Sequence, residues 1–151
     1  MRVLVLGCGN PDLGDDAAGI LVVRQLRESG VAAQEHARDA LTLIDDWCDA
    51  EYVILIDTVV TGAPPGTISG CLGADAVLPR SAGPSEHSFD LASAVELARA
   101  LDRMPASLKI YAIEGGAFEP GTQPQPVVLA AADRVASLVL GEVHRLEAAE
   151  R

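Results

Sequence analysis

Short apolar runs alternate along the chain with longer segments in which apolar residues recur every three or four positions. The runs are rich in Val, Ile and Leu and predict five β-strands, at residues 3–6, 31–36, 52–56, 67–72 and 108–113. The longer segments predict four helices, at residues 15–29, 41–49, 88–101 and 126–146. Because strands and helices alternate, we predict one α/β domain over residues 1–151, a three-layer α/β/α sandwich around a five-stranded sheet.

The connection between the third and fourth predicted strands differs from the others. It contains the turn sequence Ala63-Pro64-Pro65-Gly66 and is too short for a crossover helix. The fourth strand should therefore run antiparallel to its neighbour or lie elsewhere in the sheet. The first and third strands are the most apolar, so we expect them to lie side by side near the centre of the sheet.

Two of the predicted helices have an apolar stripe that should face the sheet. The stripe of the shorter helix consists of Leu41, Ile44 and Trp47. The stripe of the helix over residues 88–101 consists of Leu91, Ala94, Val95, Ala98 and Leu101.

Composition and charge narrow the classes of function. Aromatic residues make up only 3% of the chain, so the core must be built from Val, Leu, Ile and Ala. The net charge of −11 argues against a nucleic acid or an anionic membrane as partner. No apolar run approaches the roughly 20 residues that span a bilayer. Three cysteines without CxxC spacing indicate neither a disulfide framework nor a zinc knuckle, and we expect a cytoplasmic protein.

Acidic residues follow the first and third predicted strands. The loop Gly7-Cys8-Gly9-Asn10 leads to Asp15 and Asp16, and Asp57 closes the third strand. Functional groups in α/β sheets gather beyond the carboxyl ends of the strands, so these carboxylates should share one cleft. His87, in the loop before the next helix, is a third candidate for the same edge.

Each candidate also has an ordinary structural interpretation. An aspartate at a helix start caps the helix, which explains one of Asp12, Asp15 and Asp16. It does not easily explain all three, because they repel one another unless a cation lies among them. Asp57 fits a loop cap equally well, and a single loop histidine is usually solvated. Together, two carboxylates and one imidazole suit a divalent ion such as zinc or nickel.

Other residues of these loops are weaker candidates for a functional role. The glycines begin like a dinucleotide fingerprint, but Asp12 stands where the third glycine belongs and would repel a pyrophosphate. Cys8 could be a nucleophile, although a small buried side chain is the simpler interpretation. Glu114, after the fifth strand, could add a carboxylate at the same edge or be an exposed loop acid.

In this order the motifs resemble the maturation endopeptidases of [NiFe] hydrogenases. The resemblance covers essentially the whole chain and includes Gly19, three residues after the acidic pair. It rests on four segments, which are Gly7-Cys8-Gly9-Asn10 with Asp15-Asp16, Val53-Ile54-Leu55-Ile56-Asp57, Ser85-Glu86-His87-Ser88-Phe89-Asp90-Leu91, and Ile113-Glu114-Gly115 with Phe118-Glu119-Pro120-Gly121.

The resemblance implies an endopeptidase that removes a C-terminal peptide from the nickel-loaded precursor of the large subunit of a [NiFe] hydrogenase. It maps both the metal-binding and the catalytic roles onto Asp16, Asp57 and His87, and leaves Asp15 as the helix cap. Nickel would be carried by the substrate, with zinc or another divalent ion as a surrogate. Bound there, nickel would polarise the scissile carbonyl or activate a water. It also implies a five-stranded mixed sheet, mostly parallel with one antiparallel strand.

One rival function remains, and the chain departs from the family pattern in two places. A non-catalytic nickel-binding chaperone of the same subunit would use the same residues, and in either role we expect a monomer. Many family members have glutamate where Asp16 stands, which shortens the reach here by one methylene. Many also have Asp-Gly-Gly-Thr where this chain has Asp39-Ala40-Leu41-Thr42. Loss of those glycines affects contacts with the substrate tail more than the metal site.

Overall fold

Five strands form one sheet in the order β2-β1-β3-β5-β4 in a computed structural model of the chain, which describes residues 2–36, 39–72 and 91–150. All the predicted strands and helices are present, and a short 3₁₀ helix, η1, precedes the first α-helix. In chain order the elements are β1 (Val3–Cys8), η1 (Gly14–Ala17), α1 (Ala18–Glu28), β2 (Ala33–His36), α2 (Ala40–Trp47), β3 (Tyr52–Val59), β4 (Ile68–Leu72), α3 (Leu91–Ala100), β5 (Ser107–Glu114) and α4 (Pro126–Ala149).

The sheet is mixed, as predicted. Strands β2, β1, β3 and β5 are parallel, and β4 pairs antiparallel with β5. β1 and β3 are neighbours, with β3 in the middle of the sheet. The carboxyl ends of the four parallel strands therefore meet at one edge, which we call the carboxyl edge.

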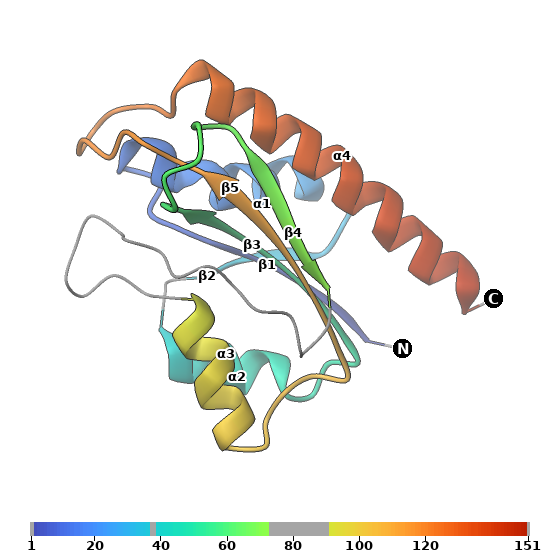
Figure 1. The fold of residues 1–151 in the computed structure, drawn as a ribbon. Coiled ribbons are helices and arrows are strands. Elements are labelled where there is room, and N and C mark those ends of the chain that lie inside the picture. Colours follow the sequence, from blue (N-terminus) through green and yellow to red (C-terminus); the bar gives the residue numbers. More distant parts are fainter. Residues whose placement is uncertain (1, 37–38, 73–90, 151) are drawn as a thin grey trace.

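Helices cover both faces of the sheet and make the predicted three layers (Figure 1). Strand residues alternate between two cores. Val5, Ile54 and Ile56 pack with α1 and α4. Leu6 and Leu55 pack on the other face with α2 and α3.

The ends of the apolar stripes differ from the prediction. Leu41 is 59% exposed, because the first turn of α2 directs it outward and Leu43 is buried beside Ile44 and Trp47 instead. Leu101 is 47% exposed, because it follows the last residue of α3 and no longer continues the helical stripe. The middle of the α3 stripe, from Ala94 to Ala98, is buried as predicted.

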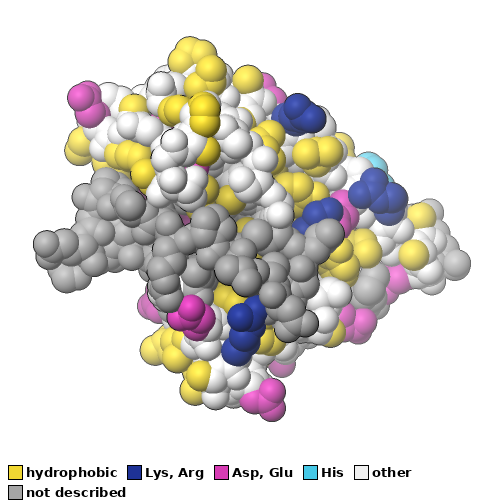
Figure 2. Space-filling view, in the orientation of Figure 1, with side chains coloured by type: hydrophobic (Ala, Val, Ile, Leu, Met, Phe, Trp, Pro, Cys, Tyr) yellow, Lys and Arg dark blue, Asp and Glu magenta, His cyan; other side chains and the backbone are white. Residues whose placement is uncertain are grey.

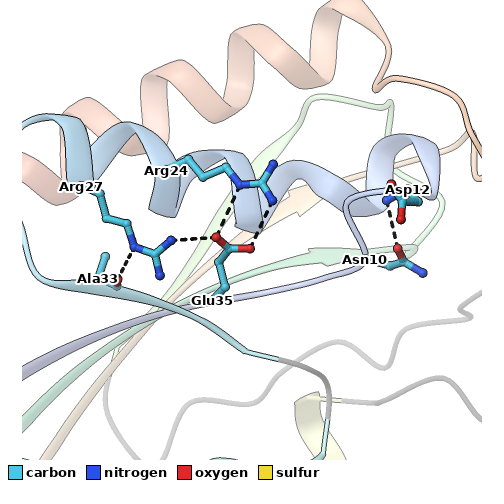
Figure 3. A network of polar contacts seen from close by, with 6 residues as sticks. All are labelled: Asn10, Asp12, Arg24, Arg27, Ala33 and Glu35. Carbon is cyan, nitrogen blue, oxygen red and sulfur yellow. Dashed lines mark hydrogen bonds and ion pairs between the residues drawn. The ribbon is translucent and has the colours of Figure 1, made fainter.

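Two polar networks tie helices to strands. On the edge strand β2, the Glu35 carboxylate accepts hydrogen bonds from Arg24 and Arg27 of α1 (Figure 3). Between α4 and the sheet, the buried Glu142 carboxylate accepts hydrogen bonds from the hydroxyls of two tyrosines, Tyr52 and Tyr111. The Glu35 network lies near the carboxyl end of β2, opposite Gly7 of β1, and the Glu142 network joins α4 to β3 and β5. Both networks hold a helix against strands, so we assign them a role in stabilising the scaffold.

The acidic side chains of the described residues do not form a single patch on the face of the molecule that Figure 2 shows. Figure 2 shows acidic side chains dispersed over this face, although the net charge is −11. Among the described residues, no helix is long and apolar enough to cross a membrane.

Candidate active site at the carboxyl edge of the sheet

Two glycines bring the start of α1 close to the ends of β1 and β3. Gly9 has φ 152°, and a Cβ there would overlap the carbonyl oxygen of Asp16. Gly19, in the first turn of α1, lies so close to the carbonyl oxygens of Cys8 and Ile56 that a side chain would not fit. Close backbone contacts at these two glycines therefore place Asp15 and Asp16 beside the ends of two neighbouring strands.

Asp16 lies in η1 and is only 3% exposed. Its carboxylate Oδ2 accepts a hydrogen bond of 3.0 Å from the backbone N–H of Asn10. Its own N–H donates to the carbonyl of Leu13, at 3.0 Å. The loop after β1 thus folds back on Asp16 and fixes it at the carboxyl edge.

Asp57 lies inside β3 and does not close it, contrary to the prediction. The strand continues to Val59 because β5 is equally long and pairs with it throughout, Asp57 opposite Ala112. Asp57 is 2% exposed, and its Oδ1 accepts the Thr58 N–H at 2.7 Å. By strand alternation its side chain belongs to the face covered by α2 and α3.

Thr58 connects Asp57 to the acidic pair. Its side chain belongs to the opposite face of the sheet, where Oγ1 donates to the carbonyl of Asp15 at 3.2 Å. Asp15 and Asp16 are consecutive residues of η1, so the turn and the end of β3 are held together. The expected convergence of these two strand ends is therefore present in the structure.

His87 lies outside the described residues. In the part of the chain that the structure describes, no group of three His, Cys, Asp or Glu residues could hold a metal ion. The assignment of metal binding and catalysis to Asp16, Asp57 and His87 stays a prediction.

Asp15 does not cap its own helix, contrary to the prediction. Neither η1 nor α1 has a side-chain cap, and the fully buried Asp15 carboxylate instead binds the segment between β5 and α4. Four N–H groups donate to it, from the backbones of Gly116, Ala117 and Gln125 and from the Gln125 side chain. Burial alone would raise the pKa of this carboxyl, but these hydrogen bonds outweigh it and hold the pKa below its usual value.

Glu114 is buried, contrary to the expectation of an exposed loop acid. It ends β5 and is 3% exposed. Its carboxylate accepts hydrogen bonds from the N–H of Thr61, at 2.8 Å, and from the Thr61 hydroxyl, at 2.5 Å. Glu114 thereby fixes the segment after β3 to the end of β5 and is a structural acid of this edge.

The loop after β1 and the loop before α4 form one wall beside Asp16. Their backbones exchange hydrogen bonds from Gly14 N–H to Thr122 O, from Asp15 N–H to Ala117 O and from Gly121 N–H to Asp12 O. Sequence reasoning missed this wall, because its two halves are about a hundred residues apart. Only the segment Phe118-Glu119-Pro120-Gly121 signalled it, and only through the resemblance.

Two other polar residues near this edge, Cys8 and Asp39, have structural roles. Cys8 is fully buried in the core beneath α2 and α3, as the simpler interpretation predicted. Asp39 caps α2, where its side chain accepts the N–H groups of Leu41 and Thr42.

His36 was not a candidate, yet it is buried at the end of β2, opposite Cys8. Its Nε2 lies 3.2 Å from Oδ2 of Asp46. Among the described residues, neither ring nitrogen has a hydrogen-bond partner with good geometry. A lone histidine at the end of a short strand gave no signal in the sequence that would separate it from a solvated one.

Comparison with known proteins gives a consistent result. A family model described as hydrogenase maturation protease matches residues 36–142. A relative from Methanocaldococcus jannaschii that carries the name of a hydrogenase maturation protease is 28% identical, over 95% of this chain and 97% of its own length.

Two solved structures of hydrogenase maturation proteases have the same fold as this chain. The hydrogenase maturating endopeptidase of Escherichia coli superimposes with a TM-score of 0.80 at 24% identity, covering 96% of this chain and 93% of that chain. The [NiFe] hydrogenase maturation protease of Thermococcus kodakarensis gives a TM-score of 0.71 at 22% identity, covering 93% and 98%. At these identities the likeness establishes the fold, and the family model carries the assignment to a family.

Proposed function

Because this chain belongs to the hydrogenase maturation protease family, we propose that it removes a C-terminal peptide from the nickel-loaded precursor of a [NiFe]-hydrogenase large subunit. Membership of the family makes it a peptidase of hydrogenase maturation. It does not favour the rival prediction of a non-catalytic nickel chaperone. The precursor as substrate, its nickel, and action as a monomer in the cytoplasm belong to the proposal.

The observation that carries the proposal is the burial of two carboxylates at neighbouring strand ends. Asp16 is 3% exposed and Asp57 is 2% exposed, and both lie where a ligand of an α/β sheet is expected. Burying a carboxylate costs free energy unless hydrogen bonds or a cation compensate it. Two of them at one edge suit a site that receives a divalent ion.

The chemistry of these donors fits nickel. Asp16 and Asp57 would supply carboxylate oxygens, and His87 an imidazole nitrogen, to the nickel that the substrate brings. This mixed oxygen and nitrogen set suits a borderline divalent ion, so zinc or another such ion could stand in as a surrogate. Nickel supplies Lewis-acid chemistry near the scissile bond. In this proposal the chain's own residues hold the substrate metal, and the wall beside Asp16 would contact the peptide next to it.

Variants of the three residues test the site. We expect Asp16→Asn, Asp57→Asn and His87→Ala each to lower cleavage of nickel-loaded precursor by about 100-fold or more, because even changes to residues behind a metal ligand cost about 10–100-fold. Cleavage is read as the mass change at the precursor's C-terminus, and circular dichroism checks that each variant is folded.

Asp12→Asn is the matched control. Asp12 lies in the same acidic loop but is exposed, and only its backbone takes part in the wall. This variant should cleave like the parent chain. Full activity in Asp16→Asn, Asp57→Asn or His87→Ala would remove that residue from the site.

A further inference from the structure

We propose that Asp15 is a positioning residue of this site, whose carboxylate holds the turn carrying Asp16 against the loop before α4. The inference rests on the proposed function for its effect on cleavage. Its structural part, that Asp15 determines where Asp16 lies, can be tested without any substrate.

The Asp15 carboxylate is satisfied entirely by N–H donors from one distant segment. Oδ2 accepts from Gly116 N and Ala117 N, both at 2.9 Å, and from Gln125 Nε2 at 2.7 Å. Oδ1 accepts from Gln125 N at 2.8 Å. Gln125 is the N-cap residue of α4, directly before Pro126, so the Asp15 side chain joins the wall to the start of the last helix.

The backbone of Asp15 connects the loop before α4 to the segments that carry Asp16 and Asp57. Its N–H donates to Ala117 O at 2.8 Å, and its carbonyl accepts the Thr58 hydroxyl at 3.2 Å. Thr58 directly follows Asp57, and Asp16 directly follows Asp15 in η1. A shift of Asp15 would therefore move Asp16 and the end of β3 relative to each other.

The contacts require a carboxylate. An asparagine offers one acceptor oxygen and one NH₂ group, which is a donor. If the NH₂ took the place of Oδ1, it would face the Gln125 N–H. If it took the place of Oδ2, it would face three donors. In either orientation at least one buried donor loses its acceptor, which pushes the wall away from η1.

A remote variant separates positioning from general destabilisation. Glu142→Gln weakens a buried carboxylate network in the second half of α4, which joins that helix to Tyr52 at the start of β3 and to Tyr111 in the middle of β5. None of the hydrogen bonds that the described residues make in this network involves η1 or the loop before α4. The kinetics of Asp15→Asn and Glu142→Gln are compared well below the unfolding temperatures of both. At that temperature both proteins are folded, so a loss of stability alone does not change the rate.

The first readout is cleavage of nickel-loaded precursor. We expect Asp15→Asn to lower kcat by about 10–100-fold with little change in KM, and Glu142→Gln to retain the parent's kcat. Equal kcat in Asp15→Asn and the parent would overturn the proposal. If the parent chain itself does not cleave, the proposed function fails, and the second readout decides on positioning.

The second readout is amide hydrogen exchange, and it needs no substrate. The Asn10 N–H donates to Asp16 Oδ2 and so reports the position of Asp16. We expect its exchange to be at least about 10-fold faster in Asp15→Asn and unchanged in Glu142→Gln. Parent-like protection of Asn10 in Asp15→Asn would overturn the proposal, whatever the activity.

Discussion

Replacing Glu142 tests how much the buried network between α4 and the sheet contributes to stability. Glu142 is 6% exposed, and its carboxylate accepts hydrogen bonds from the Tyr52 and Tyr111 hydroxyls, each at 2.8 Å. The Lys109 ammonium lies 3.1 Å from the same carboxylate. Glu142→Leu removes the partner of all three groups and leaves a half-buried ammonium without its counter-ion.

The expected cost follows from these contacts. A buried donor that loses its acceptor costs about 1–3 kcal/mol, and more if it is charged. With two hydroxyls and a half-buried ammonium left without their acceptor, we expect Glu142→Leu to destabilise the fold by about 3–5 kcal/mol in total. For a chain of this size, each kcal/mol lowers the unfolding temperature by about 2–4 °C. Glu142→Leu should therefore lower it by about 10 °C. Glu142→Gln keeps the shape and one acceptor, so about 1–2 kcal/mol is expected.

The pH dependence of stability provides a second test of the Glu142 network. Burial alone would raise the pKa of the Glu142 carboxyl, but the two tyrosine hydroxyls and the Lys109 ammonium hold it below its usual value. A carboxyl with a lowered pKa stabilises the fold above its unfolded-state pKa, and this contribution is lost as pH falls through the folded-state pKa. The stability difference between the parent and Glu142→Gln should be full at neutral pH and shrink below the unfolded-state value of 4.5.

Urea unfolding at neutral and at acidic pH measures both effects, with Tyr52→Phe as the variant that removes a single hydroxyl. That variant should cost about 1 kcal/mol, clearly less than Glu142→Leu. If Glu142→Leu unfolds at the same urea concentration as the parent at neutral pH, the network does not stabilise the fold and the reasoning is wrong.

The remaining predictions concern the carboxyl edge. Gly9→Ala should displace Asp16 and reduce precursor cleavage, because the new Cβ would overlap the Asp16 carbonyl oxygen. Gly70→Ala on β4 is the control and should cleave like the parent, since a Cβ there makes only an ordinary contact. Equal activity in the two variants would refute the role of Gly9. His36→Leu should raise the free energy of unfolding by about 1 kcal/mol, because the buried imidazole has no well-formed hydrogen bond among the described residues. The exposed His144→Leu should stay within about 0.5 kcal/mol of the parent, and a less stable His36→Leu in urea unfolding would contradict this account.

The fold could be predicted because its main determinants are local in the sequence. Apolar runs of strand length and stripes of helical spacing marked every strand and α-helix, though not η1. The short connection before β4 indicated that this strand runs antiparallel or lies elsewhere in the sheet. The errors lie where local spacing does not decide. By its spacing in the sequence Leu41 continues the apolar stripe, but in the structure the first turn of α2 exposes it. The length of β3 beyond Asp57 depends on its pairing with β5.

The candidate site could be predicted only in part, for the same reason. Topology predicted that the loop after β1 and the end of β3 lie side by side, and the hydrogen bond from Thr58 to the Asp15 carbonyl confirms this. That Asp16 and Asp57 share one functional site stays a prediction. The partners of Asp15 are separated from it by 101–110 residues, so no local pattern distinguishes it from a helix cap. The burial of Glu114 likewise depends on Thr61, which belongs to another loop.

Cleavage of the same precursor with and without nickel tests the central claim most directly. The parent chain is mixed with nickel-loaded and with nickel-free large-subunit precursor, and the mass of the precursor's C-terminus is followed over time. We predict that the nickel-loaded precursor loses its C-terminal peptide and the nickel-free precursor does not. Equal cleavage of both would show that nickel is not what the site recognises, and no cleavage of either would contradict the proposed function.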